Sequence, residues 1–180
     1  MYIAKRLKEE NIAEYVLYLW QVEDLLRANH LDMDELRTNY LAAFKAEGKA
    51  EKELEEWYEG LIRMMREEGV RESGHLQINK NTVAWLTELH NRLLHSSKYP
   101  FYSAAYYKVL PYIVEIRHKG DRQDVSEVEN CLDILYGVMM LRLQKRPVGE
   151  ETARAAADIA KLLGMLSDYY KQDKAGTLEF

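Results

Sequence analysis

Residues 14–26 read EYVLYLWQVEDLL, and this stretch decides the fold. Six consecutive residues within it, Tyr15 to Trp20, are apolar or aromatic, and no glycine or proline interrupts them. A helix that is hydrophobic around its whole circumference has to be covered on every side by other elements. We therefore expect a central helix near residues 4–29, surrounded by the helices that follow it in the chain.

The composition is that of a globular chain. Of the 180 residues, 47% are hydrophobic and 31% are charged, which is not the composition of a disordered protein. Nine glycines and three prolines are too few for a fold of many short strands and tight turns. The length suits one domain. We expect that domain to span residues 1–173 and residues 174–180 to form a frayed tail.

Charge and the length of the apolar runs exclude several classes of function. The 25 Lys and Arg residues against 30 Asp and Glu residues give a net charge of −5, and an acidic surface disfavours nucleic-acid binding. The longest apolar runs are well short of the ~20 residues that a membrane span needs. The N-terminus has cations but no apolar stretch after them, so we do not expect a signal peptide there. These observations predict a cytoplasmic protein without a membrane segment.

Further helices are expected from the spacing of apolar residues and from their caps. Asp32 and Asp124 are each followed three residues later by Glu, a pattern typical of helix starts. Asn81 is expected to cap another helix, after a loop over residues 69–80. Pro100 suits the first turn of a helix over residues 100–118, in which Pro111 should cause a kink or a break. The cleanest apolar face consists of Leu54, Trp57, Tyr58, Leu61, Met64 and Met65.

Together these patterns predict an all-α fold. We expect an antiparallel helical bundle of six or seven helices around the central N-terminal helix. No period-two alternation is long enough to predict a strand. Gly48 is the only helix breaker in the charged segment 45–56, so the second and third helices form either two helices or one kinked rod.

Glu115 and His118 are the first candidates for a metal site. The Glu-x-x-His spacing places a carboxylate and an imidazole on one face of a helix, as di-metal carboxylate bundles require. Glu23 falls on the apolar face of the central helix and His90 on that of a later helix, so both could supply further ligands. The candidate metal ligands are therefore Glu23, His90, Glu115 and His118. The alternative for Glu115 and His118 is a pair of residues on the protein surface. The alternative for His90 is a hydrogen-bonded histidine in the core.

Other polar residues have weaker patterns. The second Glu-x-x-His match, Glu72 with His75, falls in the predicted loop. Three histidines of a bundle can hold one divalent ion, so His90, with His95 and His118, forms a second candidate set. The single cysteine, Cys131, excludes an internal disulfide and is expected to be a buried apolar residue.

One line of polar and aromatic residues runs along the predicted helix 100–118. Its members are Tyr107, Lys108, Pro111, Glu115 and His118. The line could border a polar pocket, because Pro111 leaves one backbone carbonyl without its helical donor. The alternative is that the tyrosines are core residues whose hydroxyl groups reach the surface.

Several segments resemble an uncharacterised family of gut-bacterial proteins. They are IAKRLKEENIAEY at 3–15, WQVEDL at 20–25, FYSAAYY at 101–107, LYG at 135–137 and LSDYYK at 166–171. The resemblance spans the whole chain. It implies an all-helical cytoplasmic protein with a domain of unknown function, and it assigns no catalytic residue.

Two classes of function stay open. We favour a non-enzymatic helical interaction or scaffold protein that self-associates through an aromatic face or binds a protein partner. A complete catalytic constellation would leave a clearer pattern in the sequence. The alternative is a metal- or small-ligand-binding helical-bundle enzyme that uses the Glu and His residues above. The sequence identifies no substrate and no cofactor.

The substitution Trp20→Asp tests the central helix. We expect it to abolish cooperative thermal unfolding, because it would bury a charge that has no partner. Circular dichroism at 222 nm measures this. A variant that still unfolds cooperatively near the wild-type temperature would show that residues 15–20 lie outside the core.

Overall fold

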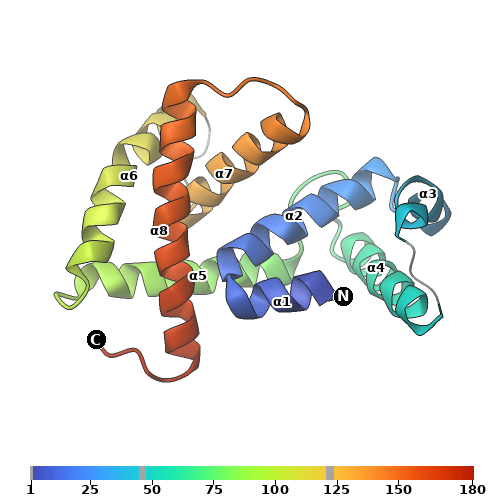
Figure 1. Cartoon of the computed structure of the whole chain (residues 1–180), viewed down its shortest axis with the longest axis horizontal. Coiled ribbons are helices and arrows are strands. Elements are labelled where there is room, and N and C mark those ends of the chain that lie inside the picture. Colours follow the sequence, from blue (N-terminus) through green and yellow to red (C-terminus); the bar gives the residue numbers. More distant parts are fainter. Residues whose placement is uncertain (1, 45–47, 121–123) are drawn as a thin grey trace. The chain divides into compact units, whose positions relative to one another are not determined.

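The computed structural model describes residues 2–44, 48–120 and 124–180. Within these ranges it contains helices and no strand, so the all-α prediction is confirmed (Figure 1). The α-helices are α1 (Tyr2–Glu10), α2 (Ile12–Ala28), α3 (Met33–Asn39), α4 (Lys49–Glu67), α5 (Gln77–His95), α6 (Pro100–Lys119), α7 (Glu127–Leu143) and α8 (Glu150–Lys174). A 3₁₀ helix, η1 (Leu41–Ala43), follows α3. Each described helix is too short or too polar to span a membrane.

The helices fall into two units. Unit 1 comprises Met1–Lys8 and Glu14–Asn81, and unit 2 comprises Glu9–Ala13 and Thr82–Phe180. A single domain over residues 1–173 and a bundle around the first helix therefore stay predictions.

The apolar stretch 15–20 lies in α2 and is largely withdrawn from solvent. Val16, Leu19 and Trp20 are at most 3% exposed, and Tyr15 is buried as well. Leu17 and Tyr18 are half-buried. Most of the stretch is covered, as expected for a helix that is apolar around its circumference, but Leu17 and Tyr18 keep part of their surface exposed and the coverage is not complete.

The helix predicted near 4–29 is divided at Asn11, so the described chain has one α-helix more than the largest number expected. The Ser167 hydroxyl donates to Asn11 Oδ1 at 2.8 Å and accepts from the Ala13 N–H at 3.2 Å. The second bond satisfies an N–H at the start of α2 that has no partner within the helix. An asparagine side chain that bonds outside its own helix favours such a break.

Unit 1 has an apolar core built from α2, α3, η1 and α4 and from three residues of the connecting segments. Its buried members are Val22, Leu26, Leu31, Leu36, Leu41, Leu54, Tyr58, Leu61, Ile62, Met65, Val70 and Leu76. Asp32 caps α3 as predicted, since its carboxylate accepts from the N–H groups of Asp34 and Glu35. Gly69, with φ of 70°, follows the end of α4, as expected for a residue that tolerates the left-handed region. The second and third predicted helices are α3 and α4, and residues 45–47 between them lie outside the described part.

The start of α5 differs from the prediction. The helix begins at Gln77, inside the expected loop 69–80, and the predicted cap Asn81 lies within its second turn. The N–H of Leu76 donates to Glu23 Oε1 at 2.9 Å, and the N–H of Gln77 donates to Glu68 Oε2 at 2.6 Å. Two carboxylates therefore cap α5, one from α2 and one from the residue that follows α4, and their negative charge is favourable at a helix N-terminus. The prediction failed because no cap residue stands next to the helix in the sequence.

Unit 2 contains most of α5 together with α6, α7 and α8. Helix α8 packs against both α6 and α7 (Figure 1). Its apolar core includes Leu86, Leu89, Leu93, Tyr102, Val109, Ile113, Leu132, Ile159, Leu162, Leu163 and Leu166. Helix α6 begins at Pro100, as the sequence predicted.

Two local predictions in unit 2 are corrected by the structure. Helix α7 is capped by Ser126, whose hydroxyl accepts from the N–H of Glu129 at 3.1 Å, and not by Asp124. The break expected at Pro111 is wrong, because helix α6 continues through this residue from Pro100 to Lys119, whereas the kink stays a prediction. Proline frees the carbonyl four residues earlier, that of Tyr107. Both residues are exposed, so water can satisfy this carbonyl and the helix continues.

Candidate functional site

The four predicted metal ligands lie in different parts of the chain. Glu23 belongs to unit 1, whereas His90, Glu115 and His118 belong to unit 2. Glu115 and His118 are both exposed on α6, and Glu115 accepts a hydrogen bond from Lys119. Among the described residues, no three His, Cys, Asp or Glu side chains are grouped so as to hold a metal ion. A metal site built from these four residues, or from His90 with His95 and His118, stays a prediction.

Glu23 is the centre of a buried polar cluster in unit 1. Its side chain is 2% exposed. Oε1 accepts from the Leu76 N–H at 2.9 Å and from Asn79 Nδ2 at 2.6 Å. Oε2 accepts from His75 Nδ1 at 2.6 Å. The cluster therefore compensates the desolvation of the carboxylate with three donors.

His75 joins this cluster from the segment predicted as a loop. Its ring stacks on Trp20, with centroids 4.2 Å apart and an angle of 14° between the planes. The Glu23 carboxylate fixes the His75 tautomer with the proton on Nδ1, an arrangement that also orients histidines as bases or ligands. Here the carboxylate simultaneously caps α5, so we interpret the cluster as structural. The sequence pointed to His75 only as the partner of Glu72, and its contact with Glu23 was missed because the two residues are 52 positions apart.

His90 lies in a second buried polar cluster, in unit 2. Its Nδ1 is 2.6 Å from the Tyr102 hydroxyl, and its Nε2 is 3.5 Å from Glu127 Oε2. Tyr106 packs its ring edge-to-face on the imidazole. Burial lowers the pKa of His90 below its ordinary value, and the attraction of Glu127 offsets this only in part. This geometry is that of a hydrogen-bonded core histidine.

The residues around His90 form one network. Arg117 Nη1 lies 4.0 Å from Glu127 Oε1, and Arg117 Nε donates to Asn130 Oδ1 at 2.7 Å. Burial raises the pKa of the Cys131 thiol to about 12, which leaves it protonated and unreactive at neutral pH. Cys131 is 1% exposed, so its prediction as a buried residue is confirmed. The sequence singled out His90 but not its partners, because they come from α6 and α7.

Helix α6 carries an exposed apolar strip opposite its buried face. The α6 strip consists of four apolar residues, Ala104, Tyr107, Pro111 and Val114, and of the polar His118 at its end, and all five are exposed. Tyr107 is 67% exposed and Val114 is 46% exposed. The spacing alternates between three and four residues, which is the repeat of a seam between two helices. The sequence showed a line along this helix, but only the structure shows that its apolar residues face solvent.

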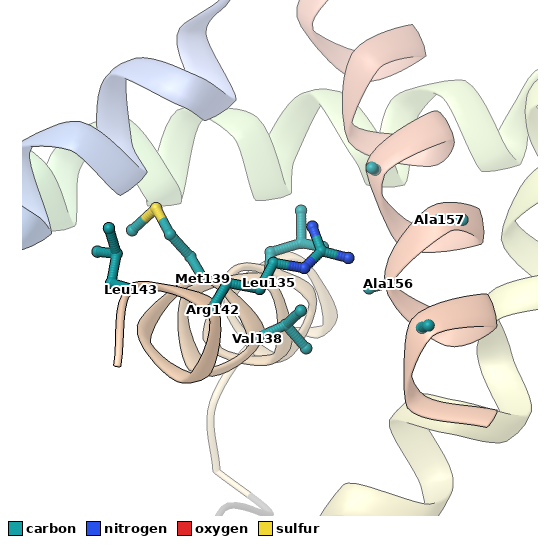
Figure 2. A pocket seen from close by; sticks show the side chains of 9 residues that line it. Leu135, Val138, Met139, Arg142, Leu143, Ala156 and Ala157 are labelled. Carbon is teal, nitrogen blue, oxygen red and sulfur yellow. The ribbon is translucent and has the colours of Figure 1, made fainter. Parts of the chain in front are cut away.

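A groove lies between α7 and α8 in unit 2 (Figure 2). Its volume is about 460 Å³, within the range of roughly 300–1,000 Å³ that small-molecule pockets occupy. The lining residues are Leu135, Val138, Met139, Arg142, Leu143, Ala153, Ala156, Ala157 and Ala160. In Figure 2 the Arg142 guanidinium extends across the groove toward α8. The arrangement offers an apolar surface with one cation beside it.

Comparison with known proteins identifies the family. Residues 1–177 match the model of a domain of unknown function, DUF4924. The chain belongs to this family. No curated protein and no solved structure matches the DUF4924 chain. The resemblance seen in the sequence is therefore confirmed as membership of an uncharacterised family, and DUF4924 membership assigns no activity.

Removal of the Glu23 carboxylate tests the first cluster. We expect Glu23→Ala to lower the free energy of unfolding by about 3 kcal/mol, because it leaves buried donors without an acceptor. Glu68→Ala is the matched control, since it removes the exposed carboxylate at the same helix start and should cost less than about 1 kcal/mol. Urea denaturation measures both. Equal, small losses would show that Glu23 is not the main cap.

The pH dependence of stability tests the second cluster. The unfolded imidazole titrates near 6.5, and burial holds the folded pKa lower. The contribution of neutral His90 to the free energy of unfolding is therefore fully present above pH 6.5. It is lost as the pH falls below this value, by at most about 1.4 kcal/mol per pH unit. Denaturation of the wild type and of His90→Gln between pH 7.5 and 5 measures this. His95→Gln, at an exposed histidine on the same helix, is the control. An unchanged slope in His90→Gln would contradict the assignment.

Proposed function

We propose that the protein is a non-enzymatic helical interaction or scaffold protein that self-associates through the α6 strip. The observation that carries the proposal is the exposed, seam-like row of apolar side chains on α6. Isolated exposed apolar residues are ordinary, whereas a continuous row indicates an interaction site. From the sequence we also propose a cytoplasmic location.

The position of the strip supports a role in binding. Tyr102, Val109 and Ile113 are the fully buried residues of α6, so the helix already has a core-facing side and does not need the strip for folding. The strip extends over roughly 20 Å of the helix, at 1.5 Å per residue. Tyrosine in particular provides a large contact area at low cost in side-chain entropy.

The polar residues support the same proposal. Glu23 and His90 already have partners inside their own units, at 2.6 Å in each case. The groove between α7 and α8 is one feature that supports the alternative. That alternative is a metal- or small-ligand-binding enzyme that uses Glu23, His90, Glu115 and His118. That groove is lined by none of these four residues.

Light scattering after size-exclusion chromatography tests self-association. We expect the wild type to dimerise as its concentration rises. The double variant Tyr107→Asp with Val114→Asp should raise the dissociation constant of the dimer at least tenfold, which corresponds to a loss of roughly 1.4 kcal/mol or more in binding free energy. Leu143→Asp is the matched control, because Leu143 is exposed but lies at the groove. A wild type that stays monomeric at millimolar concentration would refute the proposal, and dimer loss only in Leu143→Asp would assign the interface to the groove.

A further inference from the structure

We propose that two copies of the chain pair their α6 helices in antiparallel fashion about a two-fold axis. In this pair Lys108 of each copy lies beside the partner's Glu115. The inference rests on the proposed self-association and adds the identity of the partner, its direction and its register.

The arrangement of the α6 strip supports a seam between like helices. Ala104, Pro111 and His118 are each seven residues apart and form one row, and Tyr107 and Val114 form the second row. These are the a and d rows of a heptad repeat. A helix that exposes both rows can pair with a helix that exposes the same two rows, and a second copy provides one.

Charges on one edge of the strip select the antiparallel direction. Lys108 and Glu115 are seven residues apart on the same edge, and their side chains are 68% and 50% exposed. In an antiparallel pair this edge meets the same edge of the partner. A parallel pair would instead place Lys108 and Glu115 against Ser103 and Leu110 of the partner subunit. Only the antiparallel direction joins opposite charges.

The same charges select the register. With Pro111 level with the partner's Val114, Tyr107 packs against the partner's His118. Lys108 then lies within about one helical turn of the partner's Glu115 along the axis. A shift of one heptad in either direction would bring Lys108 against the partner's Lys108, or Glu115 against the partner's Glu115. Like charges across an interface are costly, so one register is preferred.

The charged residues already have partners within the chain, and the pairing extends these contacts. Lys108 Nζ lies 2.6 Å from Asp158 Oδ1, and Glu115 is bonded to Lys119. In the dimer the signs alternate from Asp158 to Lys108, then to the partner's Glu115 and the partner's Lys119. Alternating networks of this kind contribute more than isolated surface pairs. Because each copy contributes a short seam, we expect a concentration-dependent dimer and not an obligate one.

Cysteine cross-linking tests the direction. An equimolar mixture of Tyr107→Cys and His118→Cys should form a disulfide-linked heterodimer under mild oxidation, whereas neither variant should link to itself. Within one helix these positions are separated by roughly 16 Å, so the antiparallel pair keeps identical cysteines apart. The native Cys131 is buried with a raised thiol pKa and stays out of the reaction. Self-linked Tyr107→Cys, with no heterodimer in the mixture, would overturn the antiparallel pairing.

Charge reversal tests the register. Lys108→Glu should raise the dimer dissociation constant about tenfold, because it sets two carboxylates against each other. The double variant Lys108→Glu with Glu115→Lys should restore the wild-type value within about threefold. Asp158→Asn removes the ion pair that Lys108 makes within the chain, and we expect it to raise the dissociation constant less than Lys108→Glu does. An equal loss in the single and double variants would overturn the assigned register.

The outcomes separate this inference from the proposed function. A wild type that is monomeric at every concentration overturns both. A stable dimer with parallel cross-links, or one insensitive to Lys108→Glu, overturns the pairing and leaves self-association standing. Circular dichroism of each variant establishes that it is folded before its association is compared.

Discussion

The burial of the Glu23 carboxylate is the constraint on which unit 1 depends. A charge that is 2% exposed is tolerated only where donors replace the water it has lost. Three donors do so, from His75, Leu76 and Asn79. Leu76 directly precedes α5, and its N–H donates to Glu23. The carboxylate that needs these donors therefore also sets where α5 begins. One residue of α2 therefore determines the position of a helix more than fifty residues later in the chain.

Unit 2 follows the same rule with different residues. Tyr102 bonds to the buried His90, and Arg117 lies near Glu127, whose side chain is partly exposed. The pKa directions follow from this packing, since burial disfavours the charged imidazole and the charged thiolate alike. Glu23 and His90 have hydrogen-bond partners within their units, while a row of mostly apolar groups on α6 faces outward. That contrast is the reason we assign the function to a surface and not to an internal site.

Local patterns predicted part of the fold correctly. The starts at Asp32 and Pro100 and the stop at Gly69 depend on residues adjacent to the helix end, so the sequence reveals them directly. The predictions at Asn81 and at residues 4–29 failed because distant groups control those ends. At α5 the cap comes from another helix, and at Asn11 the partner is Ser167 of α8. Candidate site residues showed the same division, since Glu23 and His90 were found by their apolar surroundings but their partners were not.

The sequence by itself determined the helical class, the burial of Tyr15, Val16, Leu19 and Trp20, and the family, because these follow from periodicity, from apolar content and from likeness along the whole chain. Only the tertiary structure decided which polar groups meet and which side of α6 remains uncovered. Helical periodicity assigns residues to a face of a helix, but whether that face is buried depends on which elements pack against it. Contacts between residues far apart in the sequence set that packing, and they have no signature in the residues next to each helix.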